Sequence, residues 1–133
     1  MPEQKETQGV FVDGILYTVG GYGFRGKTSN KIHSYDPKAN EWKLFATLPY
    51  GLSANALAKN ENTIWIAGDY VNLGFIASLN VETKKLTVYI SDEFIGRRHA
   101  GVVHHKGRLI VFGGNTNADR ESSLKSMQVF EVL

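Results

Sequence analysis

The sequence predicts an all-β chain that forms half of a β-propeller, with three four-stranded antiparallel blades of which the last lacks its fourth strand. One observation behind this prediction is an apolar run ending in small residues, which occurs at 15–21, 64–68 and 109–114. The last small residue falls at 21, 68 and 114, so the repeat measures 47 and then 46 residues. Four short strands repeated at about this period are typical of propeller blades.

A second observation is a pair of apolar residues, seven positions apart, that follows the first two runs. Tyr35 and Trp42 form the first pair, and Leu79 and Leu86 form the second. Phe130 stands in the tyrosine position a third time, without a partner seven residues later in this sequence. No window of a dozen residues has the spacing of an amphipathic helix, so strands are the expected elements.

The first unit sets out the elements in chain order. They are a strand at 9–12, a turn at Asp13-Gly14, a strand up to Gly20-Gly21, a polar loop, a strand with Tyr35, a turn at 36–40 and a strand with Trp42. The third unit starts in the same way, with a strand at 100–104 and a turn at Lys106-Gly107. Because its fourth strand is missing, we expect a free sheet edge at 127–132.

Composition narrows the function classes. The 15 Lys+Arg against 13 Asp+Glu give a net charge of +2, too small to indicate a nucleic-acid or membrane partner. The lack of cysteine excludes a disulfide scaffold, a cysteine-ligated zinc site and a thiol nucleophile. No apolar run approaches the roughly 20 residues of a membrane span, and the polar start MPEQKETQ is no secretory signal. We expect a soluble, cytoplasmic protein.

The combined motif resembles kelch repeats. It consists of the glycine pairs Gly20-Gly21 and Gly113-Gly114, the segment Tyr35-Asp36-Pro37, Trp42, and the lead-in Arg97-Arg98-His99-Ala100-Gly101. The resemblance implies a propeller in which the tyrosine and tryptophan pack between blades. The middle unit departs from it, with Ala67-Gly68, Leu79 and Leu86, but leucine keeps these positions apolar. The expected division is a flexible segment at 1–8 and blades at 9–49, 50–94 and 95–133.

Three blades cannot close a ring, since propellers need at least four. Two copies of the chain would give 3 + 3 = 6 blades in a two-fold ring, with blade one of each copy against blade three of the other. The chain could instead be a piece of a longer propeller. The initial Met favours the homodimer.

One local motif imitates a phosphate-binding loop. Residues 21–28, GYGFRGKT, satisfy both G-x-x-x-x-G-K-[ST] and G-x-G-x-x-G. Such a loop works because a helix follows and aims its N–H groups at the phosphates. The next residues are poor helix formers and run into Pro37, so the sequence favours an ordinary loop between strands.

The sequence predicts no metal and no cofactor. His104 and His105 are neighbours in a strand and point to opposite faces, while His99 and His105 lie about 20 Å apart along it. Copper-radical oxidases share the kelch fold, but their cofactor requires a cysteine, which this chain lacks.

Binding to a protein partner is the predicted function, because propellers present loops of successive blades on one face. Aromatic and arginine side chains in such loops are the usual anchors of an interface. The predicted binding residues are Tyr22, Phe24, Arg25, Tyr70, Arg97, Arg98 and Asn117, in the loops at 22–30, 69–74, 94–98 and 115–121. Each could instead pack against a neighbouring loop.

The alternative is a carbohydrate-binding or sugar-isomerising propeller, since one kelch branch interconverts the anomers of sugars such as sialic acids. Arg25, Arg97, Arg98 and His99 could then contribute to a basic, polar pocket. Arg97 and Arg98 also have a structural interpretation, as arginines that hold the start of a repeat. Stacking of single-stranded nucleic acid on the loop at 22–27 is disfavoured, because acidic residues nearly balance basic ones.

Overall fold

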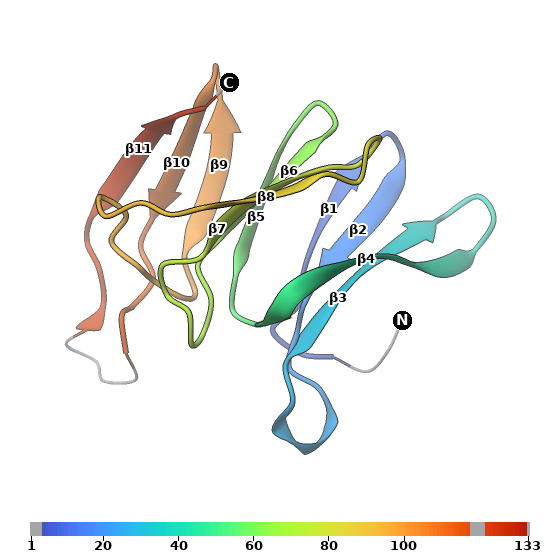
Figure 1. The fold of residues 1–133 in the computed structure, drawn as a ribbon, viewed down its shortest axis with the longest axis horizontal. Helices are drawn as coiled ribbons and strands as arrows, with labels where there is room; N and C mark the ends of the chain where they lie inside the picture. Colours follow the sequence, from blue (N-terminus) through green and yellow to red (C-terminus); the bar gives the residue numbers. More distant parts are fainter. Residues whose placement is uncertain (1–3, 118–121, 133) are drawn as a thin grey trace.

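The computed structural model describes residues 4–117 and 122–132, and confirms the all-β fold with three antiparallel sheets (Figure 1). The strand orders are β1-β2-β3-β4, β5-β6-β7-β8 and β11-β10-β9. We call the three sheets blades 1, 2 and 3. The strands are β1 (Gln8–Val12), β2 (Ile15–Val19), β3 (Ser29–Asp36), β4 (Glu41–Leu52), β5 (Ala56–Asn60), β6 (Thr63–Ala67), β7 (Ile76–Asn80), β8 (Leu86–Tyr89), β9 (Gly101–His105), β10 (Arg108–Phe112) and β11 (Met127–Glu131).

The predicted hairpin turns form where the sequence places them. Asp13 and Gly14 join β1 to β2 with φ of 48° and 81°, and Lys106 and Gly107 join β9 to β10 with φ of 47° and 75°. Two successive positive φ values match the right-handed twist of the strands that they connect. The segment after the phosphate-loop motif is strand β3, so the loop at 21–28 does not lead into a helix; it holds one short 3₁₀ turn, η1 (Phe24–Gly26).

Each blade has two faces, because successive side chains of a strand point to opposite sides of the sheet. We call the face toward the next blade the forward face and the opposite one the rear face. One buried cluster joins blade 1 to blade 2 and includes Val19, Ile66 and Leu79. A second cluster joins blade 2 to blade 3 and includes Trp65 and Leu109. The rear face of blade 1 and the forward face of blade 3 are left without a neighbouring blade among the described residues.

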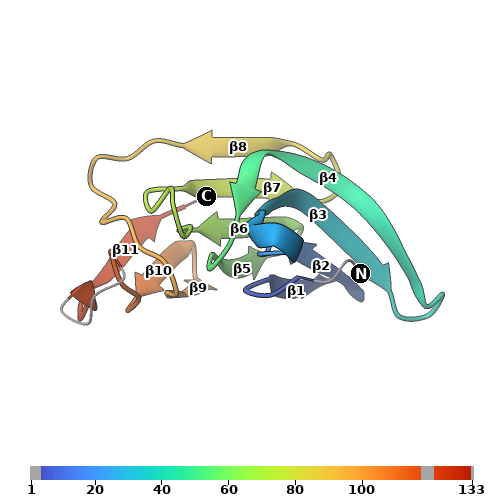
Figure 2. The same cartoon turned by 90° about the horizontal axis from the view of Figure 1, so that it is seen from below.

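The inner edges of the blades are linked by the segments that lead into β1, β5 and β9, the innermost strands in Figure 2. Glu6, Ala54 and His99 occupy the same place in these lead-ins, and their φ values are 56°, 53° and 54°. The Ala54 N–H donates to the Glu6 carbonyl at 3.3 Å, and the His99 N–H donates to the Ala54 carbonyl at 2.9 Å. A chain of backbone hydrogen bonds therefore runs from blade to blade along the inner edge.

Glycine is required where one blade's second strand ends against the next lead-in. A Cβ built on Gly20 would collide with the Leu52 carbonyl, and one on Gly68 with the Arg97 carbonyl. Both glycines also have positive φ, 64° and 74°. Gly113 holds the same place in blade 3, with φ of 63°, but no described atom lies within 4 Å of its Cβ position. Gly113 thus has the backbone conformation of the other two glycines, and the space beside it is open where they meet the next lead-in.

Candidate functional site

The long loops of all three blades lie at one end of the molecule, the lower end in Figure 1. We call this end the loop face. A hollow of about 480 Å³ opens there between the loops of blades 1 and 2. Tyr22 and Tyr70 line it from the two blades, with Lys5 and Glu6 from the first lead-in. Two of the predicted binding residues therefore meet at one surface hollow, although they stand 48 positions apart in the sequence.

The Tyr70 loop is fixed by a buried carboxylate. Asp69 is 1% exposed, and its Oδ1 accepts a hydrogen bond from the Ser53 N–H at 2.8 Å. Its Oδ2 accepts from the N–H groups of Val71 and Asn72, at 3.2 and 2.8 Å. These bonds hold the turn that carries Tyr70, which stays 42% exposed. Asp69 was not among the residues predicted from the sequence, because its role depends on a hydrogen bond from Ser53, which lies 16 residues earlier in the lead-in to blade 2.

Cations lie over both tyrosine rings. The Arg98 guanidinium carbon is 3.9 Å from the centre of the Tyr70 ring, and Arg98 Nη1 donates to the Tyr70 carbonyl at 3.2 Å. The Lys5 ammonium lies 5.2 Å from the centre of the Tyr22 ring. His99 meets the edge of the Tyr70 ring, with ring centres 6.0 Å apart. The loop face thus presents two aromatic rings, each beside a positive charge.

A backbone pairing between the lead-in and the long loop recurs in each blade. Lys5 forms an isolated antiparallel bridge with Tyr22, and Arg98 forms one with Asn115. Tyr70 donates its N–H to the Ser53 carbonyl at 2.9 Å. In each of the three pairs, the loop residue follows the lead-in residue by 17 positions. This constant spacing is the signal by which Lys5 could have been found from the sequence.

Arg97 does not belong to this surface, contrary to its selection as a binding residue. It is 0% exposed, and burial lowers its pKa. Its guanidinium donates to the carbonyls of Ile95, Gly113 and Ser126, at 3.0, 3.1 and 3.1 Å. It also reaches the Ser126 hydroxyl and the Gln128 side-chain carbonyl, at 3.3 and 3.0 Å. Arg97 ties the blade 3 lead-in to the ends of β10 and β11, as its structural interpretation predicts.

The other predicted residues lie elsewhere on the loops. Arg25 is exposed on the 3₁₀ turn, with φ of 60°. The side chain of Phe24 lies outside the described part of the structure, as do residues 118–121 of the third loop. Asn117 is exposed, and its carbonyl accepts hydrogen bonds from the Asn115 side chain and from the Ser122 hydroxyl. The structure therefore brings together Tyr22, Tyr70 and Arg98 of the seven.

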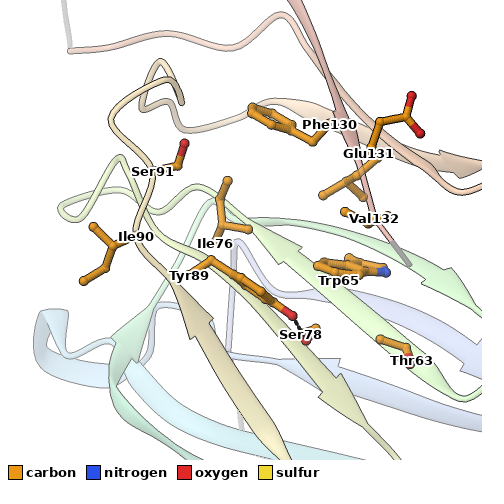
Figure 3. Close-up of a pocket in the computed structure, with 11 residues that line it drawn as sticks. Thr63, Trp65, Ile76, Ser78, Tyr89, Ile90, Ser91, Phe130, Glu131 and Val132 are labelled. Atoms are coloured by element: carbon orange, nitrogen blue, oxygen red, sulfur yellow. Dashed lines mark hydrogen bonds between the residues drawn. The ribbon is translucent and has the colours of Figure 1, made fainter.

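A second, larger groove lies between blades 2 and 3, away from the loop-face hollow. Its volume is about 540 Å³. Figure 3 shows Trp65, Ile76 and Tyr89 of blade 2 on one side of it, and Phe130 and Val132 near the end of the chain on the other. No predicted binding residue lines this groove.

No cluster of three metal-ligating side chains occurs within 4–117 and 122–132. No helix of these residues is long and apolar enough to cross a membrane. His33 lies half-buried on the rear face of blade 1, and burial, with a smaller contribution from Lys31, lowers its pKa.

Comparison with known proteins identifies the repeat. The family model described as "Kelch motif" matches residues 8–49, which cover β1, β2 and β3 of blade 1 and most of β4. The solved structure of YjhT, a kelch propeller, superposes with a TM-score of 0.73 over 86% of this chain and 46% of its own, at 17% sequence identity. The chain is a kelch-repeat protein. At this identity, the likeness to YjhT shows the kelch propeller fold alone.

The curated relatives that this chain resembles include both an enzyme and a protein that is not named as an enzyme. Spermatocyte protein spe-26 of Caenorhabditis elegans is 28% identical over 122 residues, which are 86% of this chain and 21% of that protein. N-acetylneuraminate epimerase of Shigella flexneri is 31% identical over 94 residues, 65% of this chain and 25% of the enzyme. The chain spans about a fifth of the length of the first curated relatives that it matches.

Proposed function

We propose that the chain is a non-catalytic, protein-binding kelch module whose recognition surface is the hollow between Tyr22 and Tyr70. The observation that carries this proposal is the pairing of each ring with a cation, Lys5 and Arg98, beside a concave surface. Aromatic and arginine side chains in a central hollow dominate the binding energy of protein interfaces. The hydrogen bonds to Asp69 support the proposal, since a fixed loop loses little conformational freedom on binding.

The partner surface should be acidic and partly apolar. Val71, 75% exposed, extends the hollow with an aliphatic side chain, and Lys5 supplies positive charge at its lining, while Arg98 lies buried against the Tyr70 ring. Arg25 and Asn117, exposed on the flanking loops, complete the proposed rim. A cytoplasmic location is part of this proposal and rests on the sequence analysis alone.

Binding is tested by capture from a lysate with the immobilised chain, followed by mass spectrometry. Proteins specific to the hollow should be lost with Tyr22→Ala/Tyr70→Ala and kept with Tyr89→Ala. Tyr89 is the matched control because it has the same 42% exposure as Tyr70 but lies on the outer strand β8. Equal capture by all three proteins would contradict the proposal.

The alternative is a sugar-binding or sugar-isomerising propeller, favoured by the name of the epimerase relatives. Lys5, Arg98 and His99 would supply the basic groups for an acidic sugar. Titration calorimetry with N-acetylneuraminate separates the two functions. If N-acetylneuraminate binds with measurable heat and Arg98→Ala abolishes that heat, the sugar-binding function is supported. If the wild-type protein gives no heat, the protein-binding function is supported.

We further propose that two copies of the chain complete a six-bladed ring, each with blades at 9–49, 50–94 and 95–133. Two uncovered apolar faces, one at each end of the row of blades, support this ring. Phe11 and Leu44, 52% and 58% exposed, lie on the rear face of blade 1, and Phe112 and Val129, 44% and 48% exposed, on the forward face of blade 3. Apolar area of this kind usually marks an interface.

Gly113 supplies a sharp test of the ring. Leu52 and Arg97, whose carbonyls meet the equivalent glycines, stand two residues before Ala54 and His99, so Gln4 of the second copy is the residue expected at Gly113. Gly113→Ala should abolish the dimer and leave a folded monomer, because its Cβ would meet the Gln4 carbonyl. Gly14→Ala is the control, since its φ of 81° imposes similar strain in open space.

The readout is the molar mass by light scattering on a sizing column. Wild type and Gly14→Ala should have twice the mass of one chain, and Gly113→Ala the mass of one. A monomeric wild type would contradict the ring, and so would a Gly113→Ala dimer. The first result would indicate that further blades come from a longer chain.

A further inference from the structure

In blades 2 and 3, a residue of the lead-in fills the space beside the start of the third strand. This residue is Leu52 in blade 2 and Arg97 in blade 3, and both are 0% exposed. Gln4 holds the same place in blade 1, two positions before Glu6, and it is only half-buried. The space beside β3 is therefore less completely filled than its two equivalents.

The strand residues that border this space are equivalent from blade to blade. In each blade, the N–H of the glycine that ends the second strand donates to the carbonyl of the first of them, which is Lys31, Phe75 or Ser126. The second stands two positions later and is His33, Ala77 or Gln128. Because residues two apart in a strand point to the same side, both border the space.

In blades 2 and 3, the lead-in residue matches the chemistry of the strand residues. Phe75 and Ala77 belong to the same buried apolar cluster as the lead-in leucine. In blade 3, Arg97 donates to the Ser126 carbonyl and hydroxyl at 3.1 and 3.3 Å, and to the Gln128 side-chain oxygen at 3.0 Å. An apolar residue thus meets apolar residues, and a donor meets acceptors.

In blade 1, the same space is a hollow lined by basic side chains. Its volume is about 280 Å³, and it lies on the rear face of the blade. Lys31 and His33 line it from β3, Lys27 from the preceding loop and Gln4 from the lead-in. None of the described residues that line it is acidic, and neither lysine makes an ion pair within 4–117 and 122–132. The positive charge here has no partner in this part of the chain.

Two groups in the hollow reflect this lack of a partner. Burial, and then the charge of Lys31, lower the pKa of His33, whose neighbours across the sheet, Thr18 and Leu44, are uncharged. The side-chain oxygen of Gln4 is buried and has no hydrogen-bond partner among the described residues, although such groups are rarely left unpaired. Both observations indicate that the hollow is incomplete without a ligand.

Hydroxyl groups accompany the basic side chains. Thr28 and Ser29 line the same hollow. The Ser29 hydroxyl oxygen accepts a hydrogen bond from the Lys31 N–H at 3.2 Å, so its own proton is free to be donated to a ligand. The loop at 21–28, whose sequence imitates a phosphate-binding loop, thus supplies Lys27 and Thr28 to the hollow although a strand rather than a helix follows it.

We propose that this hollow binds a phosphate group, which Lys27, Lys31 and His33 hold by charge and the two hydroxyl groups hold by hydrogen bonds. A phosphate monoester carries a charge of about −1.5 to −2 at pH 7 and has several accepting oxygens. Pockets for drug-sized ligands begin at roughly 300 Å³, so this smaller hollow fits inorganic phosphate or a small phosphate ester.

The proposal goes beyond the proposed function and depends on neither the ring nor the loop-face hollow. All of the lining residues come from blade 1, its lead-in and its loop, and only Thr28 also lines the loop-face hollow. The comparison that supports it concerns each lead-in residue and the strand of its own blade.

Nuclear magnetic resonance titration of the intact chain tests the site. Inorganic phosphate and glycerol 3-phosphate, added separately at constant ionic strength, should shift the resonances of Lys27, Lys31 and His33 saturably. Tighter binding of the ester would identify a small phosphate ester as the ligand, and tighter binding of phosphate would identify the free anion. Sulfate should also bind and raise the pKa of the His33 ring, because a nearby anion favours the imidazolium.

Variants of the chain locate the anion. Lys31→Gln removes a charged donor and should weaken phosphate binding roughly tenfold. His33→Gln should weaken it more below the pKa of His33 than above it, relative to wild type at the same pH. Lys38→Gln is the matched control, because it makes the same charge change on the exposed turn at the other end of β3, and it should leave the affinity unchanged. Circular dichroism verifies that the variants are folded.

Three results would overturn the proposal. One is the absence of a saturable shift at Lys31 and His33 with phosphate, the ester and sulfate. Another is an equal loss of affinity in Lys31→Gln and Lys38→Gln, which would show a response to net charge alone. The third is unchanged affinity in Lys31→Gln, which would place the anion elsewhere. Tyr70→Ala should not affect the anion, so failure here is distinguishable from failure of the loop-face proposal.

Discussion

Arg98 of blade 3 lies over the ring of Tyr70 of blade 2, with its guanidinium carbon 3.9 Å from the ring centre and its Nη1 donating a hydrogen bond to the Tyr70 carbonyl. Only 7% of Arg98 is exposed, so solvent screens this contact little. The pair joins two adjacent blades, and its Tyr70 lines the proposed recognition surface. The contact therefore links the stability of the blade interface to the proposed recognition surface.

Arg98→Lys should lower the free energy of unfolding by about 1–2 kcal/mol, because lysine keeps the charge but loses the planar stacking and the hydrogen bond. Urea denaturation measures the change. Arg108→Lys is the control, since Arg108 pairs with Glu131 at an exposed site and such pairs contribute little. Equal effects of the two substitutions would show that the contact with Tyr70 adds no stability.

Gly68→Ala should be among the most damaging single substitutions. Its Cβ would collide with the Arg97 carbonyl, and its φ of 74° costs alanine about 1 kcal/mol in addition. We expect a loss above about 3 kcal/mol, or no folded protein. Gly14→Ala carries only the backbone cost and should lose about 1 kcal/mol. Thermal unfolding followed by circular dichroism compares them, and similar melting temperatures would refute the collision.

Truncation of Leu79 and of Phe130 should differ in a way that reports the missing strand. Leu79 is fully buried opposite Leu86, so Leu79→Ala should cost about 3 kcal/mol. Phe130→Ala removes more atoms but borders the open groove, and we expect it to cost less than Leu79→Ala. Denaturant unfolding gives both values. The reverse order would mean that the Phe130 side chain is as tightly enclosed as that of Leu79.

His33 should make the protein less stable in mild acid. Its folded pKa lies below the unfolded value of about 6.5, because burial and then Lys31 disfavour the charged ring. The unfolded chain thus binds a proton more readily, and the stabilisation present above pH 6.5 is lost as the pH falls through the folded pKa. His33→Gln should flatten this part of a stability–pH curve. An unchanged slope would assign the pH dependence to other groups.

The fold was predictable because its signals are local and repeated. The hairpin at Asp13-Gly14 needs residues that tolerate positive φ, and the run before each glycine is apolar because the second strand packs against a neighbouring blade, on both faces in blade 2. The substitution of the aromatic pair by Leu79 and Leu86 was also predictable in its effect. Volume and apolarity suffice to fill the space between blades.

The site was predictable only in part, because loop residues are brought together by neighbouring blades. Tyr22, Tyr70 and Arg98 were identified as exposed-loop candidates, but nothing local shows that Asp69 fixes the loop of Tyr70. Arg97 was predicted as an exposed binding residue, but it is buried, and the reason is physical. Arginine is seldom buried without a carboxylate, and here five hydrogen bonds to uncharged groups replace one.

The chain of hydrogen bonds through Glu6, Ala54 and His99 has a mechanical consequence. It joins the blades at their inner edges, while β4 and β8 make no comparable backbone hydrogen bonds to a neighbouring blade among the described residues. The easiest deformation is then a rotation of the blades relative to one another about this line of inner hydrogen bonds. The groove beside Phe130 is lined in part by β8 and β11, the outermost strands of their sheets, where a rotation about the inner line produces the largest displacement. Such a rotation would change the width of this groove while the inner hydrogen bonds stay intact.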